Sequence, residues 1–123
     1  MKLREIRDLL DAEVITGEAT LEKEIQYAFA ADLLSDVLAL GRGTGVQTLL
    51  ITGIIHPQVI HAGNIFDLGA IIFVRGKRPV EATLQLAIEN QIPLLVTPYI
   101  MYETCGRLYQ HGIKPAIAKV KNG

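Results

Sequence analysis

Residues 70–98 decide the fold of this 123-residue chain, and they read Ala-Ile-Ile-Phe-Val-Arg-Gly-Lys-Arg-Pro-Val-Glu-Ala-Thr-Leu-Gln-Leu-Ala-Ile-Glu-Asn-Gln-Ile-Pro-Leu-Leu-Val-Thr-Pro. The run from Ala70 to Val74 is apolar and rich in β-branched and aromatic residues, which is typical of a strand buried on both faces. Pro79 predicts the first residue of a helix, because its ring pre-sets φ and its missing N–H is not needed there. Asn90 ends the helical spacing, and Ile92–Val96 is a second apolar run. Strand, helix and strand in this order predict a right-handed βαβ unit with parallel strands.

The rest of the chain repeats this alternation. Apolar spacing predicts an opening helix that carries Leu3, Ile6, Leu9 and Leu10 on one face. Short apolar runs predict further strands over residues 13–16, 25–30 and 48–52. Helical spacing predicts a helix capped by Asp32 with a buried stripe of Leu33, Leu34, Val37, Leu38 and Leu40, another that begins at His56-Pro57, and a last one from Pro98 or Tyr99 to Gly112. The end of the chain predicts an edge strand within residues 113–120 and a frayed tail over residues 119–123.

This alternation of strands and helices predicts one domain over residues 1–123 with an α/β fold. The expected architecture is a three-layer helix–sheet–helix sandwich around a mainly parallel sheet. The strand order is not readable from one sequence.

Composition excludes several classes of partner. The 12 basic and 13 acidic residues give a net charge of −1, so neither a nucleic acid nor an anionic membrane surface is expected as a partner. The single cysteine, Cys105, excludes an intrachain disulfide framework and favours a reducing compartment. The first residues carry no apolar signal core, and the longest apolar runs are too short to span a bilayer. We therefore predict a cytoplasmic protein.

Ligands of open parallel sheets bind at the carboxyl ends of the strands. The residues expected at those ends are Asp32, Thr52, Gly53, His56, Arg75, Gly76, Lys77, Arg78, Thr97 and Tyr99. Arg75, Lys77 and Arg78 precede a predicted helix N-terminus, whose partial positive charge favours anions. This arrangement predicts an anion site. The alternative interpretation is that the three cations are solvated turn residues that pair with nearby carboxylates.

Other chemical patterns are incomplete. Residues 41–45, Gly-Arg-Gly-Thr-Gly, lack the phosphate-loop pattern and follow a predicted helix, so they predict a flexible connection. His56 and His61 are five residues apart, which does not place two metal ligands on one helical face. Ser35 lacks a nucleophile-elbow pattern, and Cys105 on an apolar helix face is typical of a packing residue. We therefore predict no metal, no cofactor and no catalytic set of residues.

Several segments together resemble stand-alone DRTGG domain proteins, and the resemblance extends from Val14 to Gly112. The segments are Val-Ile-Thr-Gly-Glu (14–18), Tyr-Ala-Phe-Ala-Ala-Asp-Leu-Leu-Ser-Asp-Val-Leu-Ala (27–39), Leu-Ile-Thr-Gly (50–53), His-Pro-Gln-Val-Ile (56–60), Ala-Ile-Ile-Phe-Val-Arg-Gly-Lys-Arg-Pro (70–79) and Ile-Pro-Leu-Leu-Val-Thr-Pro (92–98). Residues 31–38 are the most specific part. The chain departs from the name-giving motif at residues 53–56, where an acidic–arginine pair would follow the third strand. It departs again at residues 74–76, where Thr-Gly-Gly would close the fourth strand.

The resemblance implies a fold similar to the N-terminal domain of HPr kinase/phosphorylase and to the DRTGG domain of some phosphotransacetylases, where a regulatory role is suspected. It implies a non-catalytic regulatory or ligand-sensing domain that binds a nucleotide or another anionic small molecule at the strand ends. Stand-alone members occur in anaerobic bacteria near iron-only hydrogenase components, so one alternative is an interaction adaptor for a redox (hydrogenase-type) enzyme complex. A second alternative is a small enzyme that acts on a phosphorylated substrate. Kinase activity is not expected, because the phosphate loop of HPr kinase belongs to its other domain.

The last predicted helix is apolar over more than one face, whereas a helix packed on one face of a sheet should show a single stripe. Its tyrosines and methionine are residue types enriched at interfaces. We therefore predict a homodimer whose interface includes Tyr99, Met101, Tyr102, Leu108 and Tyr109. The alternative is that the C-terminal segment folds over this helix within one chain.

Overall fold

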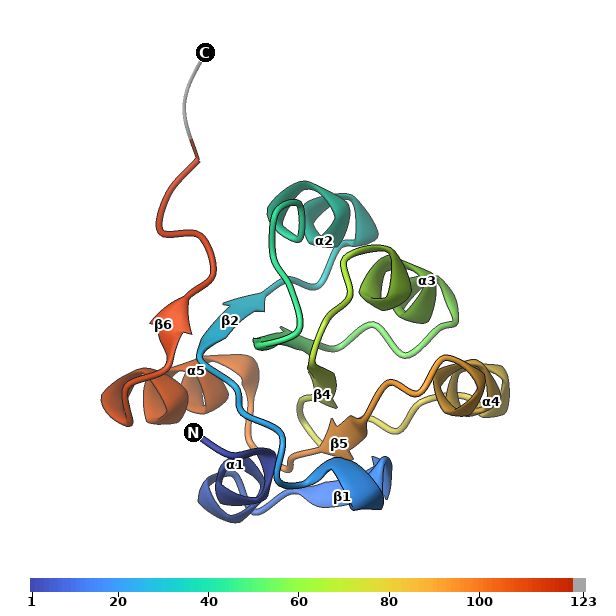
Figure 1. Cartoon of the computed structure of the whole chain (residues 1–123), viewed down its shortest axis with the longest axis horizontal. Coiled ribbons are helices and arrows are strands. Elements are labelled where there is room, and N and C mark those ends of the chain that lie inside the picture. The colour runs from blue at the N-terminus through green and yellow to red at the C-terminus, as the bar shows by residue number, and fades with distance from the viewer. Residues whose placement is uncertain (121–123) are drawn as a thin grey trace.

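The βαβ unit predicted from residues 70–98 forms within a computed structural model that describes residues 1–120 (Figure 1). Strand β4 (Ala70–Phe73) pairs in parallel with β5 (Leu94–Val96), and helix α4 (Glu81–Glu89) connects them. The prediction that Pro79 is the first helical residue is wrong, because the helix begins only at Glu81. The backbone of Val80 is extended and its N–H donates to the Ile55 carbonyl at 3.3 Å, which holds this segment against the loop after β3.

The other elements follow the order expected from the sequence. They are α1 (Leu3–Leu9), β1 (Glu13–Thr16), the short 3-10 helix η1 (Glu18–Thr20), β2 (Tyr27–Ala30), α2 (Leu34–Leu40), β3 (Thr48–Thr52), α3 (Gln58–Ile65), α5 (Met101–Gln110) and β6 (Lys114–Pro115). The strands form one sheet in the order β1-β5-β4-β3-β2-β6. Every neighbouring pair is parallel except β1 and β5.

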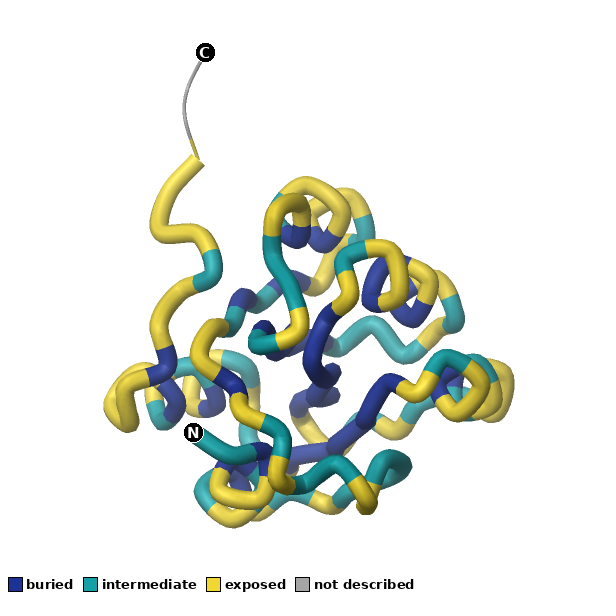
Figure 2. The backbone as a smooth tube through the Cα atoms, viewed as in Figure 1, coloured by how far each residue is buried: buried dark blue, intermediate teal, exposed yellow. Residues whose placement is uncertain are grey.

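Helices cover both faces of this sheet, which confirms the three-layer α/β sandwich. Helices α2, α3 and α4 lie on one face, and α1 and α5 lie on the other (Figure 1). Every residue of β3 and β4 is buried, so these strands lie at the centre of both cores (Figure 2). Leu50, Ile71 and Phe73 belong to the core beneath α2, α3 and α4, whereas Leu49 and Ile72 belong to the core beneath α1 and α5. Burying one such side chain stabilises the fold by about 1.5–3 kcal/mol.

Two predictions about the second strand and its helix need correction. The strand begins at Tyr27 and not at residue 25, because the N–H of the buried Ile25 donates to the Met1 carbonyl and not to a neighbouring strand. The predicted buried stripe of α2 is also too wide. Val37 is fully buried, but Leu33 is 63% and Leu38 is 42% exposed, because α2 turns only one face toward the sheet.

The C-terminal edge strand is shorter than predicted. Only Lys114–Pro115 pairs with β2, and the N–H of Ala116 makes a last hydrogen bond to the Ala28 carbonyl at 2.8 Å. Beyond Ala116, no described residue of the C-terminal segment makes a backbone hydrogen bond to β2. The predicted frayed tail falls largely on residues 121–123, which lie outside the described residues.

Helix α5 presents fewer residues to solvent than the dimer prediction assumes. Leu108 is buried in the core beneath α1 and α5, so its assignment to a dimer interface is wrong. Tyr99 and Met101 are partly buried against the same core. Tyr102 and Tyr109 remain largely exposed, at 86% and 71%.

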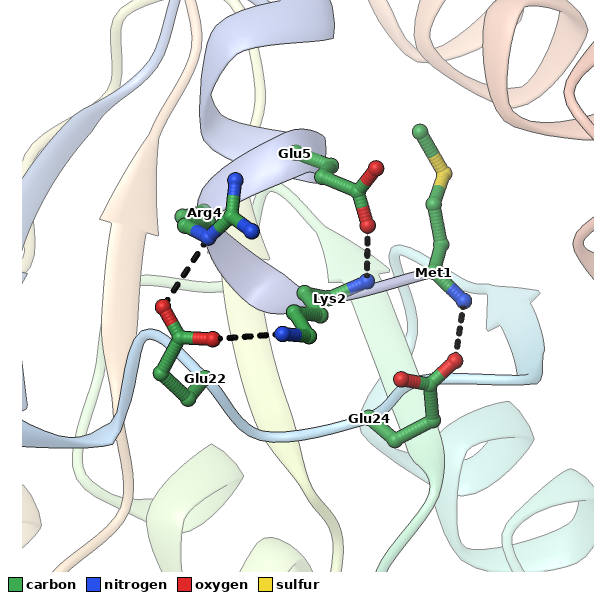
Figure 3. A network of polar contacts seen from close by, with 6 residues as sticks. All are labelled: Met1, Lys2, Arg4, Glu5, Glu22 and Glu24. Atoms are coloured by element: carbon green, nitrogen blue, oxygen red, sulfur yellow. Dashed lines mark hydrogen bonds and ion pairs between the residues drawn. The ribbon is translucent and has the colours of Figure 1, made fainter.

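Ion pairs fasten the first residues of the chain to residues 22–24 (Figure 3). The Met1 ammonium donates to Glu24 at 2.6 Å, and both Lys2 and Arg4 contact Glu22 at 2.8 and 2.9 Å. The Lys2 backbone N–H donates to the Glu5 carboxylate at 2.8 Å, which satisfies one of the unpaired donors at the start of α1. Exposed pairs of this kind each contribute at most about 1 kcal/mol, so they orient the segment more than they stabilise the fold.

Among the described residues, no helix is both long enough and apolar enough to cross a membrane.

Thr97 fixes the end of α1 to the end of β5. Its side chain is 0% exposed, and its hydroxyl donates to the Leu10 carbonyl at 2.6 Å. No other described residue donates to that carbonyl. We predict that Thr97→Val lowers the free energy of unfolding by about 1–3 kcal/mol, because a buried acceptor loses its partner. Urea unfolding measures this loss.

The matched control is Thr104→Val. Thr104 is equally buried, but the Ile100 carbonyl that accepts its hydroxyl also accepts the Thr104 backbone N–H. We expect a smaller loss for this variant, and equal losses for the two variants would contradict the assigned role of Thr97.

Candidate functional site

The parallel strands β2, β3, β4 and β5 end along one side of the sheet, which we call the carboxyl edge. It comprises the segments that follow these strands, residues 31–32, 53–56, 74–78 and 97–99. The structure therefore brings all the segments that carry predicted ligand residues to one edge. Their side chains play different parts there.

Asp32, Gly53 and Lys77 form the middle of the carboxyl edge. The Asp32 carboxylate accepts the Gly53 N–H at 2.7 Å, so it joins the ends of β2 and β3. The predicted capping of α2 by Asp32 is wrong, because Leu33 precedes the helix and no side chain caps it. The Lys77 amine lies 3.4 Å from the Gly53 carbonyl oxygen. A Cβ at position 53 would lie only 3.0 Å from the Asp32 Oδ1, so the close approach of these residues favours glycine.

The two threonines predicted to bind a ligand are buried and have structural roles. Thr52 and Thr97 are both 0% exposed. The Thr52 hydroxyl accepts the Ile54 N–H at 3.1 Å, and the Thr97 hydroxyl also accepts the Tyr99 N–H at 3.3 Å. These hydroxyls shape the loops of the carboxyl edge and are not directed at a ligand from the solvent.

The basic turn, residues 75–78, is held by its backbone. Arg75 and Gly76 both have positive φ, at 57° and 66°. A non-glycine residue in this region costs about 1–3 kcal/mol and needs support from its surroundings. The support comes from the segment after β5, because the N–H groups of Arg75 and Gly76 donate to the carbonyls of Tyr99 and Thr97, both at 2.8 Å. The N–H of Lys77 donates to the Val74 carbonyl at 3.1 Å. Backbone donors of Arg75, Gly76 and Lys77 are thus occupied, and an anion at this turn would be bound by side chains.

Arg78 pairs with a carboxylate whose position at this edge is not predicted from the sequence. Its guanidinium makes two hydrogen bonds to Glu13, at 2.8 and 3.2 Å. Glu13 begins β1, the antiparallel strand, so it lies opposite Val96 at the carboxyl end of β5. The Arg78 side chain lowers the pKa of Glu13, chiefly through the hydrogen bonds and also through its charge. Of the three predicted cations, Arg75 and Lys77 form no ion pair with a described residue.

His56 and Tyr99 flank the edge. His56 is exposed just before α3. The Tyr99 ring is partly buried, and the Arg107 guanidinium lies 4.1 Å from its centroid in a cation–π contact. Tyr99 thus connects the carboxyl edge to α5, which carries Arg107.

Within residues 1–120, no cluster of His, Cys, Asp and Glu side chains could hold a metal ion. Burial raises the pKa of the Cys105 thiol, so this side chain is neutral at physiological pH. A neutral, half-buried thiol behaves as a small packing residue.

Two cavities are lined by residues outside the segments of the carboxyl edge. One of about 330 Å³ lies between β2, α5 and the C-terminal segment, and the predicted interface residues Leu108 and Tyr109 line it. The other, of about 520 Å³, is bordered by residues 43–48 and includes Tyr27 and Ala116. None of the predicted ligand residues lines either cavity.

Comparison with known structures shows the fold. The chain is similar to the CBS and DRTGG domains of the regulatory region of Clostridium perfringens pyrophosphatase, solved in complex with the activator diadenosine tetraphosphate. The TM-score is 0.62 at 17% sequence identity, and the match covers 89% of this chain and 46% of that one. No protein-family model and no curated protein matches the chain. The α/β architecture is therefore DRTGG-like, as the resemblance in sequence implies, and the chain spans less than half the length of that regulatory region.

The Glu13–Arg78 pair predicts a specific pH dependence. A lowered pKa in the folded state means that the pair stabilises the fold above the pKa of unfolded glutamate. This contribution is lost as the pH falls through the lowered pKa of Glu13. We predict that Arg78→Ala raises the Glu13 pKa toward about 4.3, and that the stability difference between the two proteins shrinks in acid. Carboxyl NMR titration and urea unfolding at two pH values measure these effects.

Glu22 provides the internal control. Its pKa is also lowered, but by hydrogen bonds from Lys2 and Arg4. It should stay lowered in Arg78→Ala, and a parallel rise of both pKa values would instead indicate a global change of the protein.

Proposed function

We propose that this chain is a non-catalytic regulatory domain that senses an anionic small molecule at its carboxyl edge. Its fold is similar to that of a regulatory region that was solved with a nucleotide activator. Ligands of open parallel sheets bind at this edge, which supports the choice of site. The class of ligand that we propose is a nucleotide or another phosphorylated compound.

The main support for the proposal is that two cations of the basic turn have no carboxylate partner among the described residues. Arg75 and Lys77 lie where β4 ends, between the ends of β3 and β5, and neither is neutralised by a carboxylate of the described residues. The backbone N–H groups of Arg75 and Lys77 donate to the carbonyls of Tyr99 and Val74, so both side chains extend from a fixed backbone. Charge-assisted hydrogen bonds from such side chains to phosphate oxygens are about twice as strong as neutral ones.

The test is a thermal-shift titration of the full chain with diadenosine tetraphosphate, ATP, acetyl phosphate and inorganic phosphate. A ligand at 100 times its dissociation constant stabilises the folded state by about 2.7 kcal/mol. We predict that Arg75→Ala/Lys77→Ala abolishes the shift of whichever compound binds. The unliganded stability should change by no more than about 0.5 kcal/mol, as for most surface substitutions.

The matched control is Arg4→Ala/Arg42→Ala, which removes the same number of charges from exposed positions outside the carboxyl edge. This variant should keep the full shift. A full shift in Arg75→Ala/Lys77→Ala would place the site elsewhere, and no shift with any compound in the native chain would remove the proposed sensing function.

We also propose that two copies associate through the exposed face of α5. Tyr102 and Tyr109 are seven residues apart, which places them on one face of α5, and they are 86% and 71% exposed. Tyrosine is a residue type enriched at interfaces. The same face would serve the alternative function, an adaptor for another protein. The mass of the free chain distinguishes the two.

We predict a dimer mass for the native chain in light scattering at micromolar concentration. Tyr102→Glu should shift the mass toward that of one chain, because it buries a charge in the interface. Glu103→Gln is the control, since it changes a neighbouring residue that already pairs with Arg107 on the same helix. A native chain that scatters as a monomer would favour the adaptor.

A further inference from the structure

The apolar cavity of about 330 Å³ is separate from the carboxyl edge. It is lined by residues of β2, α5 and the segment 113–120. Figure 1 shows β6 beside β2 at this end of the sheet. The buried Leu108 and Ile113 line its inner side, and Ile117 and Val120, which are 40% and 66% exposed, line its open side. Cavities that bind small molecules have volumes of about 300–1,000 Å³ and are mostly apolar. The cavity therefore has the size and the walls of a small-ligand site.

The charges around this cavity are all of one sign. Lys114 and Lys119 line it, and no aspartate or glutamate does. Both lysines are exposed, and neither forms an ion pair within the part of the chain that the structure describes. Apolar walls bordered by two ammonium groups complement a molecule with an apolar body and an anionic head.

The edge of β2 adds a polar contact to the same cavity. Alternate residues of a parallel strand bond to opposite neighbours, and Ala28 accepts the last hydrogen bond from the β6 side. Ala30 is the next residue that faces this side, and it lines the cavity. No hydrogen bond joins Ala30 to the C-terminal segment within residues 1–120. A ligand in the cavity would meet this part of the β2 edge.

We propose that the cavity binds a small amphipathic anion, such as a medium-chain or aromatic carboxylate. The apolar body lies against α5 and β2, and the acidic head lies beside Lys114 and Lys119. This site is additional to the carboxyl edge, and it does not depend on the function proposed there.

The probe is decanoate, titrated below its micelle concentration into the ¹⁵N-labelled full chain. We expect saturable shifts of the amides of Ala30, Cys105 and Lys114. Decanol and decylamine have the same apolar body with a neutral or cationic head. Both should bind more weakly than decanoate.

The deciding variant is Lys114→Glu/Lys119→Glu. Decanoate should lose at least tenfold in affinity, decylamine should gain affinity, and decanol should be unchanged. The gain by decylamine also shows that the variant is folded, because a damaged cavity would lose all three probes. Arg75→Ala/Lys77→Ala is the matched control and should bind decanoate as the native chain does.

Three outcomes overturn the proposal. In the first, the affinity for decanoate is the same after the charge reversal. In the second, the shifts fall on the amides of Gly53 and Lys77 at the carboxyl edge. In the third outcome, the amides of Ala30 and Lys114 shift with protein concentration and decanoate leaves them unchanged, which would assign this face to a second copy of the chain.

Discussion

The burial of β3 and β4 on both faces is the constraint on which the rest of the structure depends. Every residue of these strands is buried, so helices must cover the sheet on both sides. Parallel pairing of β2, β3, β4 and β5 then requires each connection to return to the same starting edge. As a result, all the turns that follow these strands collect at the opposite edge. The location of the carboxyl edge thus follows from the packing of the core.

Much of this architecture is predictable from residues 70–98, because apolar runs of strand length and helical spacing report burial directly. The start of α4 is not predictable in this way. The N–H of Val80 and the hydroxyl of Thr83 both donate to the Ile55 carbonyl, which lies far away in the sequence. This contact holds Val80 extended, whereas local preference alone places the helix start at Pro79. The number of α2 residues that are buried is not predictable either, because it depends on how the helix packs on the sheet.

The location of the candidate site is predictable from the sequence, but the partners of its side chains are not. The strand-end rule brings the correct segments together, since it depends only on parallel pairing. The role of Arg78 depends on Glu13, whose position requires knowledge that β1 is antiparallel and lies beside β5. Asp32 is likewise a residue type that caps helices, yet its carboxylate accepts the Gly53 N–H at the end of β3. Thr97 has a hydroxyl that could bind a ligand, yet this hydroxyl donates to the Leu10 carbonyl at the end of α1. Each of these outcomes is decided by a partner remote in sequence.

The two outer strands have a consequence for how copies of this chain can meet. Strand β6 is only Lys114–Pro115, and proline, a charged lysine and short length all hinder pairing with another strand. On the other side, the register of β1 against β5 shifts by one residue between Val14 and Thr16, which kinks that edge. Neither border offers a long, flat row of free backbone groups. The sheet is therefore protected against growing into an intermolecular sheet and hence against aggregation by that route, and contacts between native chains are left to helix surfaces and side chains.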